Sequence, residues 1–215
     1  MPRTARRLVS LLFPLLLVLL PVSLAWAAPA EEGRHYARIE GGAPWQAAKG
    51  KIEVAELFAY WCDHCARFQP MLEAWKAKQP KDVQLTYLPL ASSRNDALAR
   101  GFFATQAAGA TAKVHGPLFK AIHQQQTLPK NPSSDELAAW YGQQGLNAKR
   151  IKAAMDDPAL ADKLAAARKF AQRSGVEGTP TLVINGRYRI LGSSYAELLQ
   201  NADAVIAQLR AGGQP

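Results

Sequence analysis

The sequence contains little cysteine: among its 215 residues there are only Cys62 and Cys65. Small exported proteins that depend on disulfide bonds for their stability usually carry several cysteines at wider spacing. A disulfide between two such close positions would close a very short loop, so it would restrict the unfolded chain only slightly. The scarcity and the close spacing therefore argue against a purely structural disulfide.

Histidine is also scarce, which bears on zinc binding as a second explanation of the cysteine pair. Structural zinc would need two further ligands beside a C-x2-C pair. His64 lies between the cysteines, and the other three histidines have no paired ligand spacing with the motif: His35, His115 and His123. We therefore favour a redox-active dithiol that is made and broken during function. We expect no metal ion, and no cofactor besides the cysteine pair itself.

Runs of like charge are absent as well. The formal net charge is +9, but no run of five or more basic residues occurs. Scattered positive charge is typical of a solvated protein surface rather than of a nucleic-acid-binding face. With 48% hydrophobic and 20% charged residues, the chain suits one globular domain, with or without an insertion. We expect no nucleic-acid partner.

The N-terminus has the pattern of a secretory signal peptide. Three arginines in the first seven residues precede an uncharged stretch from Leu8 to Ala30, within which Ala25-Trp26-Ala27 forms a small-x-small cleavage site. A retained membrane anchor is the alternative, because the uncharged stretch is long enough to span a bilayer, but two prolines interrupt it. We predict cleavage of residues 1–27. Loss of their three arginines would lower the formal net charge from +9 to +6.

The cysteine pair lies where a predicted strand meets a predicted helix. Residues 51–61, "KIEVAELFAYW", are mostly apolar on both faces, which indicates a buried central strand. Residues 65–79, "CARFQPMLEAWKAKQ", carry apolar residues at helical spacing, with Pro70 as a possible kink. Free backbone N–H groups and the positive end of the helix dipole would meet at Cys62. Both favour a thiolate, so we predict a low pKa for this cysteine.

The rest of the chain alternates between strand and helix patterns. Residues 83–90 predict a strand, and Asn185-Gly186 between apolar runs predicts a hairpin within residues 180–191. A last helix is expected from about Ser194 to Leu209. Between these lies a helical block with expected helices over residues 95–114, 115–126, 133–145 and 147–172, where Ser134 and Asp135 resemble a helix start and Gly145 a stop.

Three segments together resemble a known family, the exported thioredoxin-fold thiol:disulfide oxidoreductases of the DsbA type. They are "ELFAYWCDHC" (56–65), "GVEGTPTLVINGRY" (175–188) and the helical block that contains "KVHGPLFKAIH" (113–123). The resemblance covers essentially the whole mature chain. It implies an α/β thioredoxin fold, a central mixed β-sheet flanked by helices, with an inserted all-helical domain. The thioredoxin-like parts would be residues 28–92 and 174–215, and the insertion residues 93–173.

The resemblance also implies roles for individual residues. Cys62, first in the pair and at the helix start, would exchange disulfides with substrate, and Cys65 would be its buried partner. His64 would favour the Cys62 thiolate through a ring N–H or its charge. Glu56, on the buried strand, would manage the proton of Cys65. A cis peptide between Thr179 and Pro180 would present the backbone of Thr179 for strand-like pairing with an extended substrate.

Two departures from the family pattern are visible. Asp63 stands where the commonest motif, C-P-H-C, has proline. A carboxylate about 6 Å from a thiolate would repel it by about 1 kcal/mol, although Asp63 could instead cap the helix and face solvent. We therefore expect a somewhat weaker oxidant than the strongest family members. Family members also often carry a lysine near the buried acid on the next strand, and "VQLTYLPL" has none.

The implied function is a periplasmic dithiol oxidase. It would donate its Cys62–Cys65 disulfide to unfolded exported proteins with free thiols, act as a monomer, and be reoxidised by a quinone-linked inner-membrane oxidase of the DsbB type. A reductase or isomerase of the same fold is the nearest alternative. Isomerases of this compartment use a separate dimerisation domain, for which the about 24 residues before Ile52 leave no room. A reductase stays open, because the resemblance extends to reducing relatives with threonine before this proline, and Asp63 points weakly the same way. A non-catalytic peptide-binding protein is an alternative from a different class.

Overall fold

The structure is a computed structural model that describes residues 29–213 and residue 215. The predicted signal peptide therefore lies outside the described residues. Within the described part of the chain, no helix combines the length and the apolar character needed to cross a membrane.

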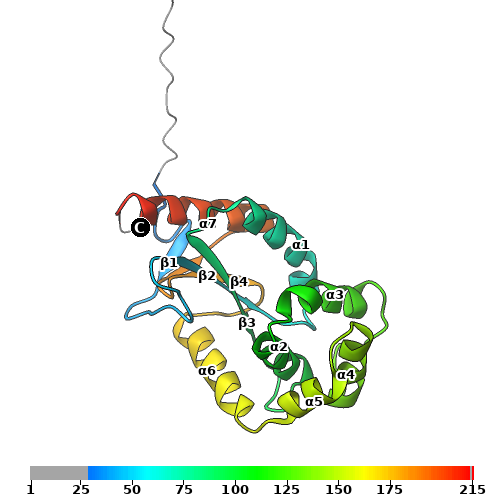
Figure 1. The fold of residues 1–215 in the computed structure, drawn as a ribbon. Helices are drawn as coiled ribbons and strands as arrows, with labels where there is room; N and C mark the ends of the chain where they lie inside the picture. The colour runs from blue at the N-terminus through cyan, green and yellow to red at the C-terminus, as the bar shows by residue number, and fades with distance from the viewer. Residues whose placement is uncertain (1–28, 214) are drawn as a thin grey trace, which may run out of the picture.

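A five-stranded mixed sheet forms the centre of the fold, with the strand order β1-β5-β4-β2-β3 (Figure 1). The strands are β1 (Tyr36–Arg38), β2 (Ile52–Phe58), β3 (Val83–Pro89), β4 (Thr181–Ile184) and β5 (Tyr188–Ile190). Strand β2 pairs in parallel with β3 and antiparallel with β4. Six of its seven residues are buried, because both its edges and both its faces are covered. The predicted buried central strand is confirmed.

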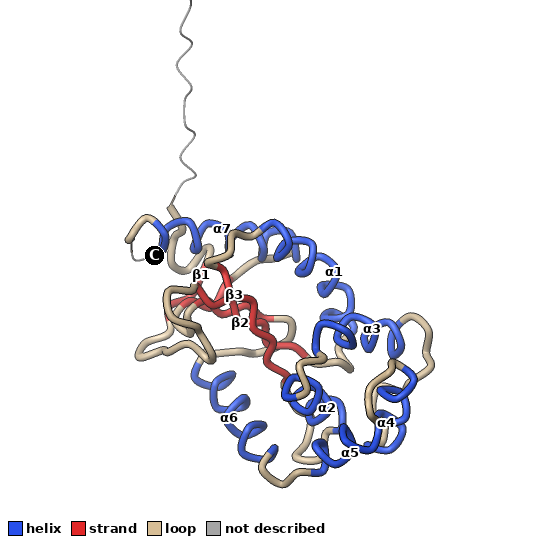
Figure 2. Tube along the Cα trace, viewed as in Figure 1, coloured by secondary structure: helices blue, strands red, loops and turns tan. Residues whose placement is uncertain are grey.

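Helices cover both faces of the sheet (Figures 1 and 2). On one face, α1 (Asp63–Lys78) and α7 (Tyr195–Arg210) pack on β2 and β4. On the other face, Leu57 and Val183 contribute to a cluster that also contains Phe170 of α6 (Leu160–Arg173). Successive residues of β4 therefore alternate between two apolar clusters, as do Val54 and Ala55 of β2, in agreement with the two-residue period of a strand.

Five helices lie between β3 and β4 in the sequence: α2 (Ala97–Ala107), α3 (Thr111–His123), α4 (Ser134–Gln143), α5 (Ala148–Asp156) and α6. The predicted helical block is confirmed, but two of its internal boundaries were wrong. The chain breaks at Gly109, whose φ of +65° ends α2, and α3 then continues through position 115. The segment expected as one helix over 147–172 divides before Pro158, which disfavours helical backbone in the preceding residue.

The helix ends follow the local sequence closely. Helix α4 begins at Ser134 as expected, and its cap is Ser133, which forms a capping box with Glu136. It ends before Gly145, whose φ of +76° suits the expected stop. Helix α1 continues through Pro70. The division of the chain at residues 92/93 and 173/174 stays a prediction.

The β4–β5 hairpin turns at the predicted Asn185-Gly186 pair. Both residues have positive φ, +50° and +64°, which this kind of turn requires. Gly186 also lies against the segment that follows β1, and a Cβ atom at this position would overlap the carbonyl oxygen of Ala43. Strand β1, which pairs with β5, was not expected from the sequence.

Because the hairpin approaches Ala43 closely, substitution of Gly186 should be more destabilising than its positive φ alone would make it. We expect Gly186→Ala to lower the free energy of unfolding by roughly 3 kcal/mol, as positive φ and overlap with backbone combine. Gly41 has a similar φ of +61° and nothing within 4 Å of an added Cβ, so Gly41→Ala should cost about 1 kcal/mol. Urea unfolding of both variants measures the difference. Equal losses would show that the contact with Ala43 contributes nothing.

Candidate active site

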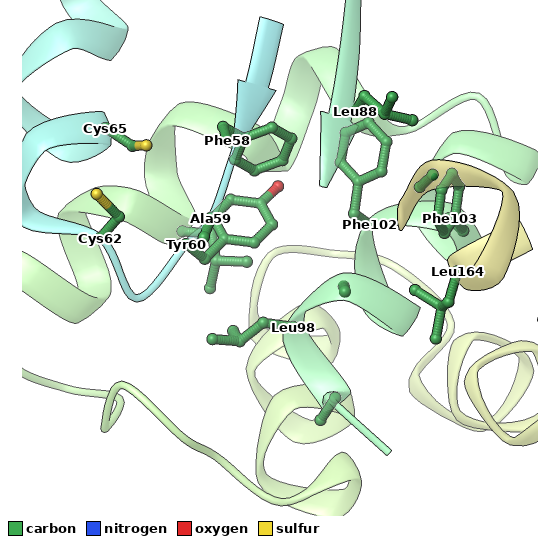
Figure 3. Close-up of a cluster of buried hydrophobic side chains, with 14 of the residues drawn as sticks. Phe58, Ala59, Tyr60, Cys62, Cys65, Leu88, Leu98, Phe102, Phe103 and Leu164 are labelled. Carbon is green, nitrogen blue, oxygen red and sulfur yellow. The ribbon is translucent and has the colours of Figure 1, made fainter. Parts of the chain in front are cut away.

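The two cysteines lie at the junction of β2 and α1. Cys62 occupies the N-cap position of α1 with extended backbone, and its side chain makes no capping hydrogen bond. Cys65 lies one turn into the helix and is fully buried, whereas Cys62 is 8% exposed. Both are free thiols. Figure 3 shows them beside Phe58 and Tyr60, at the end of the strand that leads into the motif. The predicted position at a helix start is confirmed.

The pKa of Cys62 lies below its ordinary value. Burial by itself raises this pKa, but hydrogen bonds that favour the thiolate outweigh the burial. The interactions that lower the pKa are with Thr179, with Cys65 and with the backbone of His64. The first helical turn, through His64 and Cys65, and the segment before β4, through Thr179, thus make Cys62 more acidic than an ordinary thiol.

Cys65 is shifted in the opposite direction. Burial raises the pKa of this thiol, and the negative charge that Glu56 carries when ionised raises it further. Cys62 is therefore the more acidic thiol of the pair and Cys65 the less acidic one. This asymmetry matches the division of roles between an exchanging sulfur and a buried partner.

Glu56 is buried in the centre of the sheet, 1% exposed, as predicted. Neither of its carboxylate oxygens has a hydrogen-bond partner among the described residues. Burial, and to a lesser extent the charges of Cys62 and Glu73, raise its pKa to about 8. By contrast, the equally buried Glu53 accepts backbone hydrogen bonds from Trp45 and Gln46, each 2.7 Å long. Glu56, which lies on the same strand as Glu53 but has no such partner among the described residues, is therefore protonated at neutral pH.

The strands beside Glu56 offer it no cation. Its register partners are Tyr87 on β3 and Leu182 on β4. Burial and the nearby Glu56 both raise the pKa of Tyr87. The lysine that many family members place on the next strand is missing here, as the sequence indicated, and nothing in the described part of the chain takes its place as a hydrogen-bond partner of the carboxylate.

His64 is exposed and turns its ring away from a direct hydrogen bond with Cys62. Its Nδ1 lies 3.0 Å from the hydroxyl of Tyr195 and 3.2 Å from a guanidinium nitrogen of Arg67. The backbone of His64, rather than its ring, contributes to the lowered pKa of Cys62. The proposed support of the thiolate by the ring stays a prediction. Sequence reasoning did not identify Tyr195 or Arg67.

The Thr179–Pro180 peptide bond is cis, as the family resemblance predicted. The Cys62 sulfur lies 3.4 Å from the carbonyl oxygen of Thr179. The segment before strand β4 therefore faces the exchanging cysteine across 117 residues of sequence. Thr179 and Pro180 are both partly exposed, so their backbone is accessible at the point where a substrate sulfur would approach.

Asp63 does not stand alone beside the thiolate. Its carboxylate contacts His123 and Lys130, which belong to α3 and to the loop after α3. Hydrogen bonds from Lys130 and from His123 hold the pKa of Asp63 below its ordinary value. Sequence reasoning missed both partners, because they follow Asp63 by 60 and 67 residues without any spacing pattern. Neither the helix-cap role nor an unpaired charge describes Asp63 in this structure.

His115 is a core histidine. It is 2% exposed, burial lowers its pKa to about 3, and its Nδ1 lies 2.7 Å from the hydroxyl of Tyr60. Across the part of the chain that the structure describes, no three His, Cys, Asp or Glu side chains are grouped so that they could hold a metal ion.

Comparisons with known proteins agree with this site. The chain matches the DSBA-like thioredoxin domain family over residues 87–203, a segment that begins after the cysteine motif. The thiol:disulfide interchange protein DsbA of Pseudomonas syringae pv. tomato is 34% identical over 189 residues, which cover 86% of this chain and 87% of that protein. The protein of the same name from Burkholderia cepacia is 32% identical over 91% of this chain and 93% of its own length.

Solved structures show the same likeness. The oxidoreductase DsbA from Xylella fastidiosa superposes with a TM-score of 0.79 at 37% identity, over 84% of this chain and 98% of that one. DsbA from Pseudomonas aeruginosa gives 0.74 at 30% identity, over 84% and 94%. The fold and the asymmetric cysteine pair define a thiol:disulfide oxidoreductase with a thioredoxin-like domain. The chain belongs to the DsbA family, and the predicted fold and enzyme class are confirmed.

The unpartnered carboxyl of Glu56 makes the stability of the reduced protein depend on pH. Its pKa is raised to about 8 in the folded state, whereas the unfolded chain ionises near 4.5, so folding retains a proton between these values. Stability should therefore fall as the pH rises from about 4.5 to about 8. We expect Glu56→Gln to remove this loss and to raise the free energy of unfolding at pH 7 by about 3 kcal/mol.

Urea unfolding of the reduced protein at several pH values between 4 and 8 measures this effect. The exposed Glu40→Gln is the matched control and should follow the parent at each pH. A difference between Glu56→Gln and the parent that stays constant across this range would contradict the assigned proton.

Proposed function

We propose that this protein is a periplasmic dithiol oxidase, which donates its Cys62–Cys65 disulfide to exported proteins that carry free thiols. The observation that carries the proposal is the opposite shift of the two thiols: the pKa of Cys62 is lowered and that of Cys65 is raised. Whatever stabilises the reduced thiolate makes the disulfide a stronger oxidant, because it favours the product of reduction.

The exchange would proceed in two steps. A substrate thiolate attacks the sulfur of Cys62, the Cys62–Cys65 bond breaks, and its electron pair stays on Cys65. A second substrate thiolate then attacks the substrate sulfur of the mixed disulfide and releases Cys62 as a thiolate. The substrate leaves with a new disulfide, and the enzyme leaves with two reduced cysteines. Attack at Cys62 is favoured because Cys65 is fully buried.

Glu56 would act on Cys65 in the first step. The sulfur that leaves as a thiolate lies in a buried site where the charged form is disfavoured. A carboxyl group whose pKa is about 8 carries a proton at neutral pH and can supply it to this thiolate. On reoxidation, the same group would take the proton back. Glu56 is thus the candidate proton reservoir of the pair.

Substrate binding would use the backbone of Thr179 before cis-Pro180. An extended chain that pairs with this backbone would bring its own cysteine to Cys62, since the Thr179 carbonyl lies 3.4 Å from the Cys62 sulfur. Main-chain pairing tolerates many substrate sequences. Two large apolar side chains, Trp61 just before α1 and Met71 in the middle of this helix, are exposed by 39% and 38%. Apolar segments of unfolded proteins are suited to this surface.

The signal peptide and the family likeness support export to the periplasm, where disulfides form. The reduced enzyme needs an electron acceptor there. A quinone-linked inner-membrane oxidase of the DsbB type is the partner that the family likeness favours.

Equilibration of the cysteine pair with glutathione tests the direction of the reaction, with tryptophan fluorescence as the signal because Trp61 is adjacent to the motif. DsbA itself is known to have a potential of about −120 mV and thioredoxin about −270 mV. We expect the potential of this protein to be closer to the DsbA value. A potential near that of thioredoxin would make it a reductase instead.

The double variant Cys62→Ser/Cys65→Ser is the control against a non-catalytic peptide-binding role. It should bind reduced unfolded substrate but form no disulfide in it. Substrate oxidation that persisted without the two cysteines would contradict the proposed mechanism.

A further inference from the structure

The carboxylate of Asp63 lies between the side chains of His123, on α3, and Lys130, in the loop after α3. His123 Nδ1 is 3.0 Å from one carboxylate oxygen, and Lys130 Nζ is 2.6 Å from the other. His123, the last residue of α3, has a side chain that is only 7% exposed, whereas the side chains of Asp63 and Lys130 are 58% and 51% exposed. One partner is thus fixed by packing, and the other reaches across the surface.

The second ring nitrogen of His123 is also engaged. Its Nε2 lies 2.6 Å from the backbone carbonyl oxygen of Tyr60. A backbone carbonyl and an ionised carboxylate are both acceptors only, so each ring nitrogen must donate a proton to make its bond. The two contacts together require the imidazolium form of His123. This positive charge lies at the C-terminal end of α3, where the helix dipole favours a cation.

The two residues that His123 contacts lie on either side of the reactive cysteine in the sequence. Tyr60 precedes Cys62 by two residues, and Asp63 follows it directly. His123 therefore ties the backbone before the cysteine to the side chain after it. Two cations face one anion here, so the local charge beside Cys62 is positive although the motif itself carries an aspartate.

We propose that His123 and Lys130 form a cationic clamp on the active-site loop, which cancels the repulsion between Asp63 and the Cys62 thiolate and holds the loop in place. His123 is the central positioning residue, because it makes both contacts, and Lys130 is an auxiliary charge. The inserted helical domain thereby contributes to how readily the disulfide is reduced. The clamp rests on the proposed role of Cys62 as the exchanging sulfur.

The clamp changes what Asp63 is expected to do. An unpaired carboxylate in this position would weaken the oxidant, as the sequence suggested. With the clamp in place, loss of the Asp63 charge also removes the partner that holds the cation of Lys130 and the ring of His123 beside the loop. The two charge changes oppose each other at Cys62. We therefore expect Asp63→Asn to shift the redox equilibrium by less than about twofold.

A double-mutant cycle tests the coupling between Asp63 and His123. The measured quantity is the equilibrium constant for reduction of the Cys62–Cys65 disulfide by two glutathione molecules, which yields the dithiol protein and glutathione disulfide. His123→Gln keeps a hydrogen-bonding side chain but removes the charge. We expect it to lower the constant about three- to tenfold in the parent, because a nearby unit charge no longer stabilises the thiolate. In the Asp63→Asn background, the same change should have less than a twofold effect.

Matched controls separate the clamp from general effects of substitution. His35→Gln removes a histidine near β1, and Lys152→Gln removes a lysine paired with Asp156; neither should change the constant. Lys130→Gln, at a half-exposed position, should lower it two- to threefold and covers the case in which His123→Gln fails to fold. The pKa of Cys62, followed by thiolate absorbance, should rise in His123→Gln by half a unit to one unit.

Two results would overturn the clamp. The first is a constant within twofold of the parent for both His123→Gln and Lys130→Gln, which would leave these residues a structural role only. The second is an equal fall for His123→Gln with and without Asp63, which would show a remote charge that acts independently of the aspartate. Both comparisons are ratios between variants, so they stand even if the parent proves to be a reductase. That outcome would contradict the proposed direction of the reaction without deciding the clamp.

Discussion

The stabilisation of one sulfur, that of Cys62, by the first turn of α1 is the interaction on which the active site depends. The backbones of His64 and Cys65 lower the pKa of this thiol, because Cys62 lies at the N-cap position, where N–H groups of the first turn have no partner within the helix. The sheet holds the start of this helix in position. Strand β2 is buried on both faces and ends just before the motif, so the start of α1 is fixed relative to the cis-Pro180 segment, which approaches from β4.

The same fold places two opposite environments within one helical turn. Cys62 is slightly exposed at the helix start and has a lowered pKa, whereas Cys65 lies in the core, where burial and the nearby Glu56, an acid with no hydrogen-bond partner in the described part of the chain, raise its pKa. The difference between these two environments gives the cleavage of the disulfide a direction. The electron pair that is released goes to the buried sulfur, and the exchanging sulfur is the one whose thiolate is favoured. Glu56 is tolerated in the sheet because it can stay protonated at neutral pH. The inserted segment adds a positive charge on the solvent side, through Lys130.

Much of this could be predicted from local sequence. The apolar faces of residues 51–61 and the helical spacing after Cys65 placed the motif at a strand–helix junction, and Asn185-Gly186 placed the hairpin. The cis peptide and the role of Glu56 needed the family resemblance, since neither a threonine–proline pair nor a strand glutamate indicates them. The contact of His123 with Asp63 could not be predicted, because it depends on how α3 docks against α1. Strand β1 has only three residues, too few for a recognisable alternation.

The rate of alkylation of each thiol as a function of pH tests the central claim most directly. The reduced protein is treated with iodoacetamide under native conditions, and the modified cysteine is identified by mass spectrometry. The account predicts that Cys62 alone reacts at pH 6, because the thiolate is the nucleophile, and that Cys65 stays unmodified until the protein is unfolded. Equal modification of the two cysteines, or a rate for Cys62 that rises only above about pH 8 as for an ordinary thiol, would contradict it.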